Sequence, residues 1–455
     1  MPGRLDRKSL DALVRRGEID TVLTVFPDGY ARLLGKRLTA RHFLEHAAAD
    51  GVHACIYLFT VDMEMEPLPG FTLTSWERGY GDMRMVPDMG TLRLIPWLPK
   101  TALVFCDVYT EEGEPVEEAP RWVLKRQLAR AAAQGYLVKT AAELELYCFR
   151  ETFEEARAKR YQNLTPVATY LQDYHILQTT KEEPLVRAIR NGMEAAGVPV
   201  ETSKGEWGRG QEEINLAYAE ALEMADRTVL YKHGAKEIAH LQGCSVTFMA
   251  KYDAGAAGSS FHLHSSLWDR AGRKPLFAGG KSHRQAPPLF GHWLAGQMAM
   301  ARELAYFYAP GINSYKRYQA GSFAPTRIAA GWDNRTCGFR LCGEGGALRV
   351  ENRIPGADAN PYLAFAATIA AGLHGIASRL KAPKLYEGNA YEDATLPQVP
   401  KTLREAIGEL ERSRLARSAF SDRVVDHYLH AARLEQKTFD EAVTDWELIR
   451  NFERI

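Results

Sequence analysis

Three pairs of chemically active residues lie two positions apart in segments that are typical of β-strands. They are Glu143 and Glu145 in AAELELYCF, His262 and His264 in GSSFHLHSSLW, and Glu351 and Arg353 in LRVENRIP. Residues two apart on a strand point to the same face of the sheet. Three such strands would present carboxylates, imidazoles and a guanidinium to one polar concavity. A site for divalent cations and phosphates requires such a set, whereas the packing of a sheet does not.

The first pair also has a plainer interpretation, because a Glu-x-Glu strand is often a solvated face. The neighbouring Leu146, Cys148 and Phe149, however, indicate a buried strand. Two carboxylates on such a strand repel each other unless a cation lies between them. Their position therefore favours a metal site.

The segment 206–214, EWGRGQEEI, offers two more acids. Its glycines predict a loop that enters a helix, so Glu206 and Glu213 could reach one ion from the loop and the following turn. The alternative is that both acids only stabilise a helix N-terminus through the helix dipole.

Histidines and arginines supply further candidate contacts for metals, phosphates and carboxylates. A single histidine is more often a core residue, but two of them after a Gly-Ser-Ser loop could serve as a metal ligand and a contact for a phosphate or base. Ligand sets dominated by carboxylates suit Mg²⁺ or Mn²⁺ better than zinc. Guanidinium groups suit carboxylates and phosphates, although most are simply surface charges. The candidates are Arg317, Arg335, Arg340, Arg349 and Arg353.

The composition is that of an ordinary globular protein, with 46% hydrophobic and 25% charged residues and a formal net charge of zero. We therefore expect no nucleic-acid partner and no membrane association. No apolar run is long enough for a membrane-spanning helix, and the N-terminal segment lacks the apolar core of a secretion signal. The six scattered cysteines predict reduced thiols and a cytoplasmic location.

The pattern of the chain predicts an α+β fold. Strand-like runs at 21–26 and 52–60 belong to a compact first unit, and the hydrophobic pattern changes after about residue 103. Helical spacing predicts helices over 121–134, 211–242, 285–308 and 360–380, and an amphipathic helix over 401–449 that breaks near Ser421.

Ten ordered motifs resemble the glutamine synthetase family over nearly the whole chain. Beside the three paired runs they are FPDGYARLLGKR (26–37), SWERGYGDMRMVPD (75–88), GQEEI (210–214), SVTFMAKY (245–252), NSYKR (313–317), SFAPTRIAAGWDNRTCGFR (322–340) and VTDWEL (443–448). The resemblance implies an N-terminal β-grasp domain, residues 1–105. It also implies a glutamine synthetase/guanido kinase-like catalytic domain with a curved antiparallel sheet, residues 106–455. The family further implies a homo-oligomer, usually a dodecamer of two hexameric rings, with active sites shared between neighbours.

The resemblance also assigns roles to individual residues. One metal would be held by Glu145, Glu206 and Glu213, and the other by Glu143, His262 and Glu351. ATP would contact His264, Ser266 and Arg340, and L-glutamate would contact Gly258, Arg317 and Arg353. Arg335 matches the arginine that meets the transferring phosphoryl group, and Arg317 is expected to assist catalysis.

Departures from the family pattern decide which acceptor we expect. Phe323 stands where ammonia-using members carry a flap glutamate, and Pro69 where they carry the aspartate that helps to bind ammonium. Gly346 replaces a nucleotide-contacting lysine and Ala257 an asparagine beside the glutamate site. Tyr391 corresponds only loosely to the tyrosine that is adenylylated in some bacterial members, so we predict no such regulation.

These departures predict an ATP-dependent γ-glutamyl-amine ligase with Mg²⁺ or Mn²⁺ as cofactor. Phe323, Pro69 and Phe71 are the candidate amine-binding residues. Because they carry no charge, they favour a neutral or apolar primary amine over ammonium or a polyamine. A glutamine synthetase that uses ammonium, a γ-glutamylpolyamine synthetase and a non-catalytic family member remain the alternatives.

Overall fold

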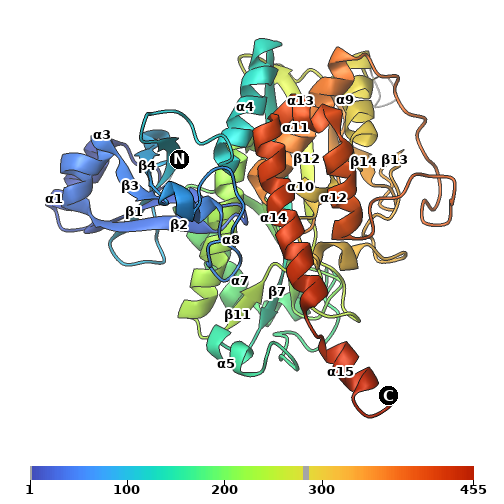
Figure 1. The fold of residues 1–455 in the computed structure, drawn as a ribbon, viewed down its shortest axis with the longest axis horizontal. Coiled ribbons are helices and arrows are strands. Elements are labelled where there is room, and N and C mark those ends of the chain that lie inside the picture. Colours follow the sequence, from blue (N-terminus) through green and yellow to red (C-terminus); the bar gives the residue numbers. More distant parts are fainter. Residues whose placement is uncertain (1–2, 280–285) are drawn as a thin grey trace.

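The computed structural model describes residues 3–279 and 286–455, which form two units around two sheets (Figure 1). A smaller unit is built from the N-terminal segments, and a larger one contains the remaining strands and most of the helices. The N-terminal sheet has a core of its own, and its other side packs on the main core, to which Leu23, Val25, Leu103 and Phe105 contribute. The predicted α+β architecture is confirmed.

The N-terminal sheet has the mixed topology of a β-grasp domain. Its strands run in the order β2 (Leu33–Thr39), β1 (Thr21–Pro27), β6 (Thr101–Thr110), β4 (Asp82–Pro87) and β3 (Val52–Cys55), and β5 (Arg93–Leu94) also pairs with β6. The central pair, β1 and β6, is parallel, and the others are antiparallel. Helical segments cover it at α1 (Arg7–Arg15), α2 (Ala40–His42), η1 (Phe43–Ala47) and α3 (Ala48–Asp50).

Two details of this unit differ from the sequence prediction. The strand expected over 52–60 ends at Cys55, because Ile56–Phe59 turn into a 3-10 helix that buries Ile56 and Phe59. The expected boundary after residue 105 falls inside β6, which pairs with β4 up to Thr110. We therefore propose a boundary between Thr110 and Pro120, where the next helix starts.

The larger sheet carries the three paired motifs on neighbouring strands. Its order is β13 (Ala330–Trp332), β14 (Phe339–Cys342), β15 (Arg349–Asn352), β12 (Phe261–Asp269), β7 (Tyr136–Phe149), β9 (Gln211–Leu216) and β8 (Val200–Gly205); β10 (Ala219–Glu220) and β11 (Ser245–Thr247) also pair with β7. All described pairs are antiparallel except β13–β14. The predicted curved antiparallel sheet is therefore confirmed, with one parallel pair at its edge.

Helices pack against this sheet and against one another. They are α4 (Pro120–Ala133), α5 (Phe153–Ala158), α6 (Ile176–Thr180), α7 (Glu183–Ala195), α8 (Ala221–Leu241), α9 (Pro288–Ala299), α10 (Ala305–Tyr308), α11 (Pro361–Ala377), α12 (Leu403–Arg412), α13 (Arg414–Phe420), α14 (Asp422–Glu441) and α15 (Asp445–Asn451). The predicted helices over 121–134 and 360–380 correspond to α4 and α11. Nearly every residue of α11 is buried, which suits its alanine-rich sequence.

The helix predicted over 211–242 is wrong in its first ten residues. Residues 211–216 form β9, and the helix starts only at Ala221. Glutamate and glutamine favour helices in isolation, but here tertiary pairing with β7 and β8 overrides that propensity. For the same reason the segment 206–214 is a turn that enters a strand, and no helix dipole acts on Glu213.

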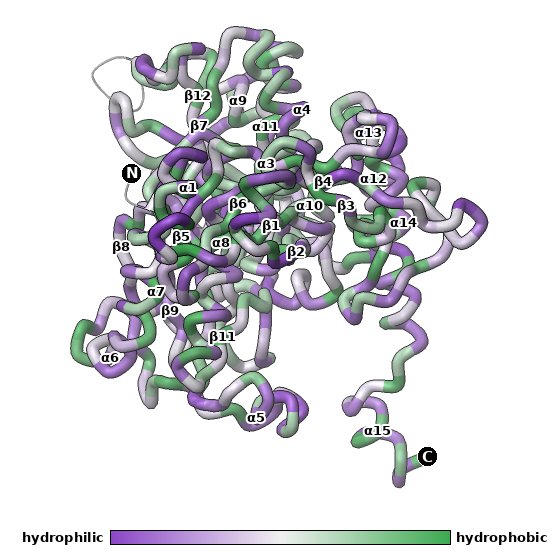
Figure 2. Tube along the Cα trace, turned by 90° about the vertical axis from the view of Figure 1, so that its left-hand side faces the viewer, coloured by the Kyte–Doolittle hydropathy of each residue, from purple (hydrophilic) through white to green (hydrophobic). Residues whose placement is uncertain are grey.

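The remaining helix predictions are confirmed with interruptions. The helix expected over 285–308 is divided into α9 and α10, and residue 285 lies outside the described residues. The segment 401–449 forms α12 to α15, and it does break at Ser421, whose φ of 83° ends α13 and whose side chain caps α14. Helix α15 extends away from the rest of the molecule (Figures 1 and 2).

Two further expectations concern membrane helices and disulfides. Across residues 3–279 and 286–455, the structure contains no helix with the length and hydropathy needed to cross a membrane. All six cysteines are free thiols, as the sequence predicts.

Candidate active site

A cavity of about 410 Å³ opens over the face of the larger sheet on which the paired motifs lie. Acids, arginines and aromatic rings line it together. Its predicted members are Glu143, Glu145, Glu206, Glu213, Gly258, His262, Arg317, Phe323, Arg335, Arg340 and Arg353. Glu351 lies buried behind them, within reach of His262. Most of the residues assigned from the sequence are therefore brought to one place.

Strand register explains why these side chains meet. In the antiparallel pairs, Glu143 lies opposite His262, Glu145 opposite Glu213, and His264 opposite Glu351. Directly opposed residues have neighbouring side chains on one face of the sheet. The two-residue spacing seen in the sequence thus places the whole set on a single surface.

One cluster combines Glu145, Glu213 and His262, whose ligand atoms lie within 4.8 Å of one another. Glu145 accepts hydrogen bonds from the Ser260 amide at 2.8 Å and from Gln211 Nε2 at 3.1 Å. Burial and the neighbouring Glu206 raise the pKa of Glu145 to about 7. The same two causes raise the pKa of Glu213 well above its usual range. Crowded acids of this kind gain stability from a bound cation.

A second cluster combines Glu143, His262 and Glu351, again within 4.8 Å. His262 Nδ1 lies 3.4 Å from Glu143 Oε2 and 3.7 Å from Glu351 Oε1. Burial, with a smaller contribution from Arg353, lowers the pKa of His262 to about 4. Its imidazole is therefore neutral at physiological pH, which is the form that ligates metals.

These donor sets fit hard divalent cations. Carboxylate oxygens dominate and imidazole is in the minority, as Mg²⁺ and Mn²⁺ sites prefer. His262 belongs to both clusters, so the two sites would be adjacent. Glu206 lines the same cavity but is ion-paired with Lys204, so a metal that bound Glu206 would have to displace that lysine.

Two buried arginines, Arg317 and Arg353, also line the cavity. Arg317 is 2% exposed and donates hydrogen bonds to the carbonyls of Arg353 and Ile354, each at 3.0 Å. Arg353 Nη1 lies 2.5 Å from Glu351 Oε1. Gly258 faces Arg317 so closely that an added Cβ would lie 2.6 Å from its Cγ. A small anionic substrate would find fixed positive charge here.

Arg335 and Arg340 lie nearer to the mouth of the cavity. Arg340 donates to Glu351 Oε2 at 2.8 Å and to Asp333 Oδ1 at 2.5 Å. Arg335 is exposed, so it is free to meet a phosphate that enters.

A separate cavity of about 520 Å³ contains the predicted ATP contacts His264 and Ser266. Arg349 donates to His264 Nδ1 at 3.1 Å, and His264 Nε2 lies 2.8 Å from Glu143 Oε1. We assign the His264 proton to Nε2 on this geometry. Glu143 lines both cavities, so it lies between them, and Gly346 lies at the wall of this second cavity.

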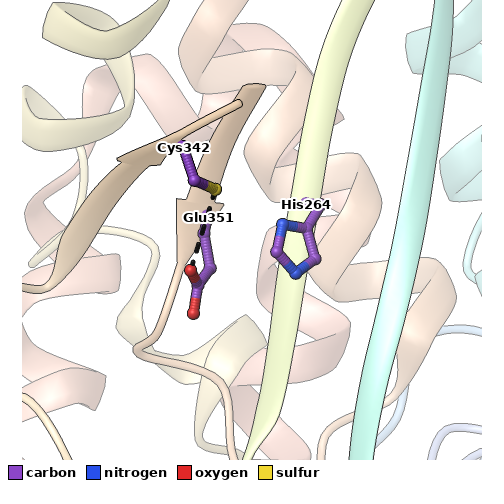
Figure 3. Close-up of side chains that lie close together, drawn as sticks. All are labelled: His264, Cys342 and Glu351. Carbon is purple, nitrogen blue, oxygen red and sulfur yellow. Dashed lines mark hydrogen bonds between the residues drawn. The ribbon is translucent and has the colours of Figure 1, made fainter. Parts of the chain in front are cut away.

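A cysteine joins this region without any signal in the sequence. Cys342 donates to Glu351 Oε2 at 3.9 Å, and His264 lies on the adjacent strand, as Figure 3 shows. The three residues could hold a metal by distance alone. Glu351 is the one carboxylate of this cluster, however, so it suits a hard divalent cation less well than the other two, each of which has two.

The uncharged side of the main cavity is aromatic. The ring of Phe323 lies 6.3 Å from that of Trp207 in an edge-to-face arrangement, and both side chains are more than half exposed. Phe323 has a φ of 58°, which is rare for a residue with a side chain and indicates a constrained loop. The sequence reasoning missed Trp207, Lys204, Asp173 and Tyr174. Only the position of Trp207 beside Glu206 could have indicated its place.

The single chain does not bring Pro69 and Phe71 to this cavity. Phe71 is buried against the rings of His427 and His430 on α14, at 4.9 and 4.6 Å between centroids. The Pro69 carbonyl accepts a hydrogen bond from His430 Nε2 at 2.7 Å. Within one chain, Phe323 is therefore the one predicted amine-binding residue that lines the cavity.

Comparison with known proteins gives matches along almost the whole chain. Residues 117–451 match the family described as glutamine synthetase, catalytic domain. A gamma-glutamylethanolamide synthetase of Streptomyces coelicolor is 50% identical over 98% of this chain and 96% of its own. A glutamate–isopropylamine ligase of a Pseudomonas species is 38% identical over the same shares. The solved structure of a GmaS/ADP complex aligns with a TM-score of 0.85 at 27% identity, covering 98% of this chain and 99% of that one.

Proposed function

The chain belongs to the glutamine synthetase family, and we propose that it is an ATP-dependent ligase that joins the side-chain carboxylate of L-glutamate to an organic primary amine. The observation that carries this proposal is one cavity that combines crowded carboxylates, fixed arginines and an exposed aromatic wall. The relatives are named for such ligations, with ethanolamine and isopropylamine as acceptors.

The first step is phosphoryl transfer. A glutamate carboxylate oxygen attacks the γ-phosphorus of ATP, the bond to ADP breaks, and γ-glutamyl phosphate forms. Gly258, Arg317 and Arg353 would position glutamate, while His264, Ser266 and Arg340 would contact the nucleotide. Arg335, which lines the main cavity, would stabilise the charge of the transferring group.

Two divalent cations would be held by Glu145, Glu206 and Glu213 and by Glu143, His262 and Glu351. When bound, Mg²⁺ or Mn²⁺ neutralises phosphate oxygens and aligns donor with acceptor. The raised pKa values of Glu145 and Glu213 support this assignment, because they mark carboxylates whose charge the protein alone does not balance.

The second step joins the amine. The amine nitrogen attacks the acyl carbon, the carbon–nitrogen bond forms and phosphate leaves. Phe323 and Trp207 offer an apolar surface on which an alkyl group gains roughly 0.8 kcal/mol per buried CH₂. We therefore propose a small primary monoamine with no second charge, such as ethanolamine or an alkylamine, as the preferred acceptor. The polyamine, ammonium and non-catalytic alternatives become outcomes of the test.

We also propose a homo-oligomer, a dodecamer of two hexameric rings, in which segment 69–80 approaches the active site of a neighbouring copy. Trp76 is 78% exposed, and the side chains of Trp446 and Ile449 on α15 and of Phe452 just after it are exposed as well. Apolar surface of this kind is characteristic of subunit interfaces.

The test is metal-dependent ADP release with glutamate and a panel of amines, with the amide product identified by mass spectrometry. We expect release to require Mg²⁺ or Mn²⁺ and an organic amine. Phe323→Glu should shift preference toward ammonium or putrescine, because a carboxylate at the mouth attracts cations. Phe323→Leu is the matched control and should keep the wild-type order. An unchanged order in Phe323→Glu would show that this position does not select the acceptor.

A further inference from the structure

The main cavity contains one acid that is not assigned to either metal. Among the described residues that line it, the acids are Glu143, Glu145, Asp173, Glu206 and Glu213. Four of these are assigned to metals, which leaves Asp173. Its side chain is 30% exposed, so it lies at the cavity surface and can meet a substrate.

The position of Asp173 is fixed by the backbone. Its amide donates to the Glu206 carbonyl at 3.1 Å, and the amide of Tyr174 donates to the Gly205 carbonyl at 3.3 Å. Tyr174 has a φ of 61°, a conformation that turns the chain sharply. The loop is thus held against the end of β8, beside the loop that carries Glu206 and Trp207.

The ammonium group of Lys204 occupies the corner of the cavity that is formed by Asp173, Tyr174 and Glu206. Its Nζ is ion-paired with Glu206, lies 3.8 Å from Asp173 Oδ1, and lies 4.4 Å from the centre of the Tyr174 ring. Two carboxylates and an aromatic face are the partners that an alkylammonium ion prefers. The side chain of Lys204 therefore shows where an amine substrate would find its charge balanced.

Metal binding would change this arrangement. A cation on Glu206 removes the carboxylate that holds Lys204 and repels the lysine ammonium. The place beside Asp173 and Tyr174 is then available to a second ammonium. Trp207 and Phe323 lie on the same cavity, so an alkyl group attached to that ammonium can lie against their rings.

We propose that Asp173 binds the ammonium of the acceptor amine and accepts the proton that must leave before the nitrogen can attack. This inference rests on the ligase function proposed above. The N–H bond breaks, its proton passes to the Asp173 carboxylate, and the freed lone pair forms the bond to the acyl carbon of γ-glutamyl phosphate. The carbon–oxygen bond to phosphate breaks, and the second N–H proton leaves with phosphate.

The decisive experiment compares two nucleophiles in wild type and Asp173→Asn. Ethanolamine is a cation at neutral pH and needs a base, whereas hydroxylamine is largely uncharged and needs none. We expect Asp173→Asn to lower kcat/KM for ethanolamine by about 100-fold or more, as loss of a general base does. Hydroxamate formation and the KM for glutamate should stay near wild type. Asp11→Asn, on the exposed helix α1, is the control and should leave both reactions unchanged.

Each outcome decides a separate point. Equal losses with both nucleophiles, or no loss with ethanolamine, would overturn the role of Asp173 while the ligase function stands. A wild type that forms neither product would overturn the proposed function itself. At limiting metal, where Lys204 still lies beside Asp173, Lys204→Met should lower the KM for ethanolamine, because it removes a competing ammonium. An unchanged or higher KM would contradict the placement of the acceptor at this corner.

Discussion

At the residue scale, the site is governed by carboxylates that lie too close together to be charged at once. Glu145, Glu206 and Glu213 face one cavity, and burial plus mutual repulsion raises the pKa of two of them. On the other side of His262, Glu351 has its pKa lowered to about 2, where Arg353 and the histidines outweigh burial. The carboxylates of Glu145 and Glu213 therefore depend more on an external cation for their charge balance than Glu351 does.

This imbalance predicts that metal affinity depends on pH. Because the pKa of Glu145 is raised to about 7, the free site holds a proton there below that pH, and a metal must displace it. Titration of the enzyme with Mn²⁺ should show affinity falling as the pH drops from about 8 to about 6, with proton release on binding at the lower end. Affinity that is constant across this range would contradict the assignment of Glu145 as a ligand.

The metal assignment also predicts the effect of Glu206→Ala. Turnover should fall by about 100-fold or more, since even indirect partners of a metal cost about 10- to 100-fold when lost. Thermal unfolding should change little, because Glu206 lies at the cavity surface. Glu143→Ala and His262→Ala should behave alike. Glu154→Ala, at an exposed position of α5, serves as a comparison for Glu206→Ala in the metal titration. Full activity in Glu206→Ala would remove Glu206 from the metal site.

At the element scale, the sequence predicts the strands with paired motifs better than the strand without one. The two-residue spacing on β7, β12 and β15 is visible because each strand carries two functional side chains. On β9 the functional residue is Glu213 alone, and GQEEI has the composition of a helix. The segment forms a strand because it pairs with β7 and β8, and no pattern within the segment indicates this pairing. Of the two aromatic residues Phe323 and Trp207, the sequence predicts only Phe323. Trp207 comes from a loop more than 100 residues away, so no local pattern links the two.

Gly258, in the loop before β12, packs closely against Arg317, and a mutation can test this contact. In Gly258→Ala the new Cβ would lie 2.6 Å from Arg317 Cγ and 2.9 Å from the Ala250 carbonyl oxygen, so the arginine or the loop must shift. We expect a higher KM for glutamate with little change in the KM for ATP, measured by steady-state kinetics. Gly29→Ala is a control, since Gly29 has no positive φ and the nearest atom to its added Cβ, Tyr428 Cε1, is 4.0 Å away. Unaltered glutamate kinetics in Gly258→Ala would separate this loop from the glutamate site.

At the scale of the whole molecule, the described chain exposes surface that a monomer would not need. Trp446 and Ile449 on α15 and Phe452 just after it are exposed, and α15 projects from the body (Figure 1). Phe71, predicted from the sequence to bind the amine, is instead covered by α14 within its own chain. A single sequence contains no direct signal of which copy completes a shared site, so this part of the prediction could not be resolved from motifs alone.

Residues 442–455, which include α15, form an exposed arm whose removal should affect the assembly. Removal of residues 442–455 should lower the particle mass measured by light scattering after size exclusion, because these apolar side chains would lose their partner surface. The variant Glu453→Gln keeps the arm and should keep the full mass. If the truncated and intact proteins have the same mass, the arm is not part of an interface.

The order of preference among acceptor amines distinguishes the proposed γ-glutamyl-amine ligase from its alternatives. The measurement is kcat/KM for ethanolamine, isopropylamine, putrescine and ammonium at saturating glutamate, ATP and Mg²⁺, with the amide products confirmed by mass spectrometry. An apolar wall of Phe323 and Trp207 beside a carboxylate-rich cavity predicts that a neutral-chain monoamine has the highest value. Ammonium should be the poorest, because it has no alkyl group for the rings to cover. If ammonium or putrescine had the highest kcat/KM, Phe323 and Trp207 would not select the acceptor as proposed.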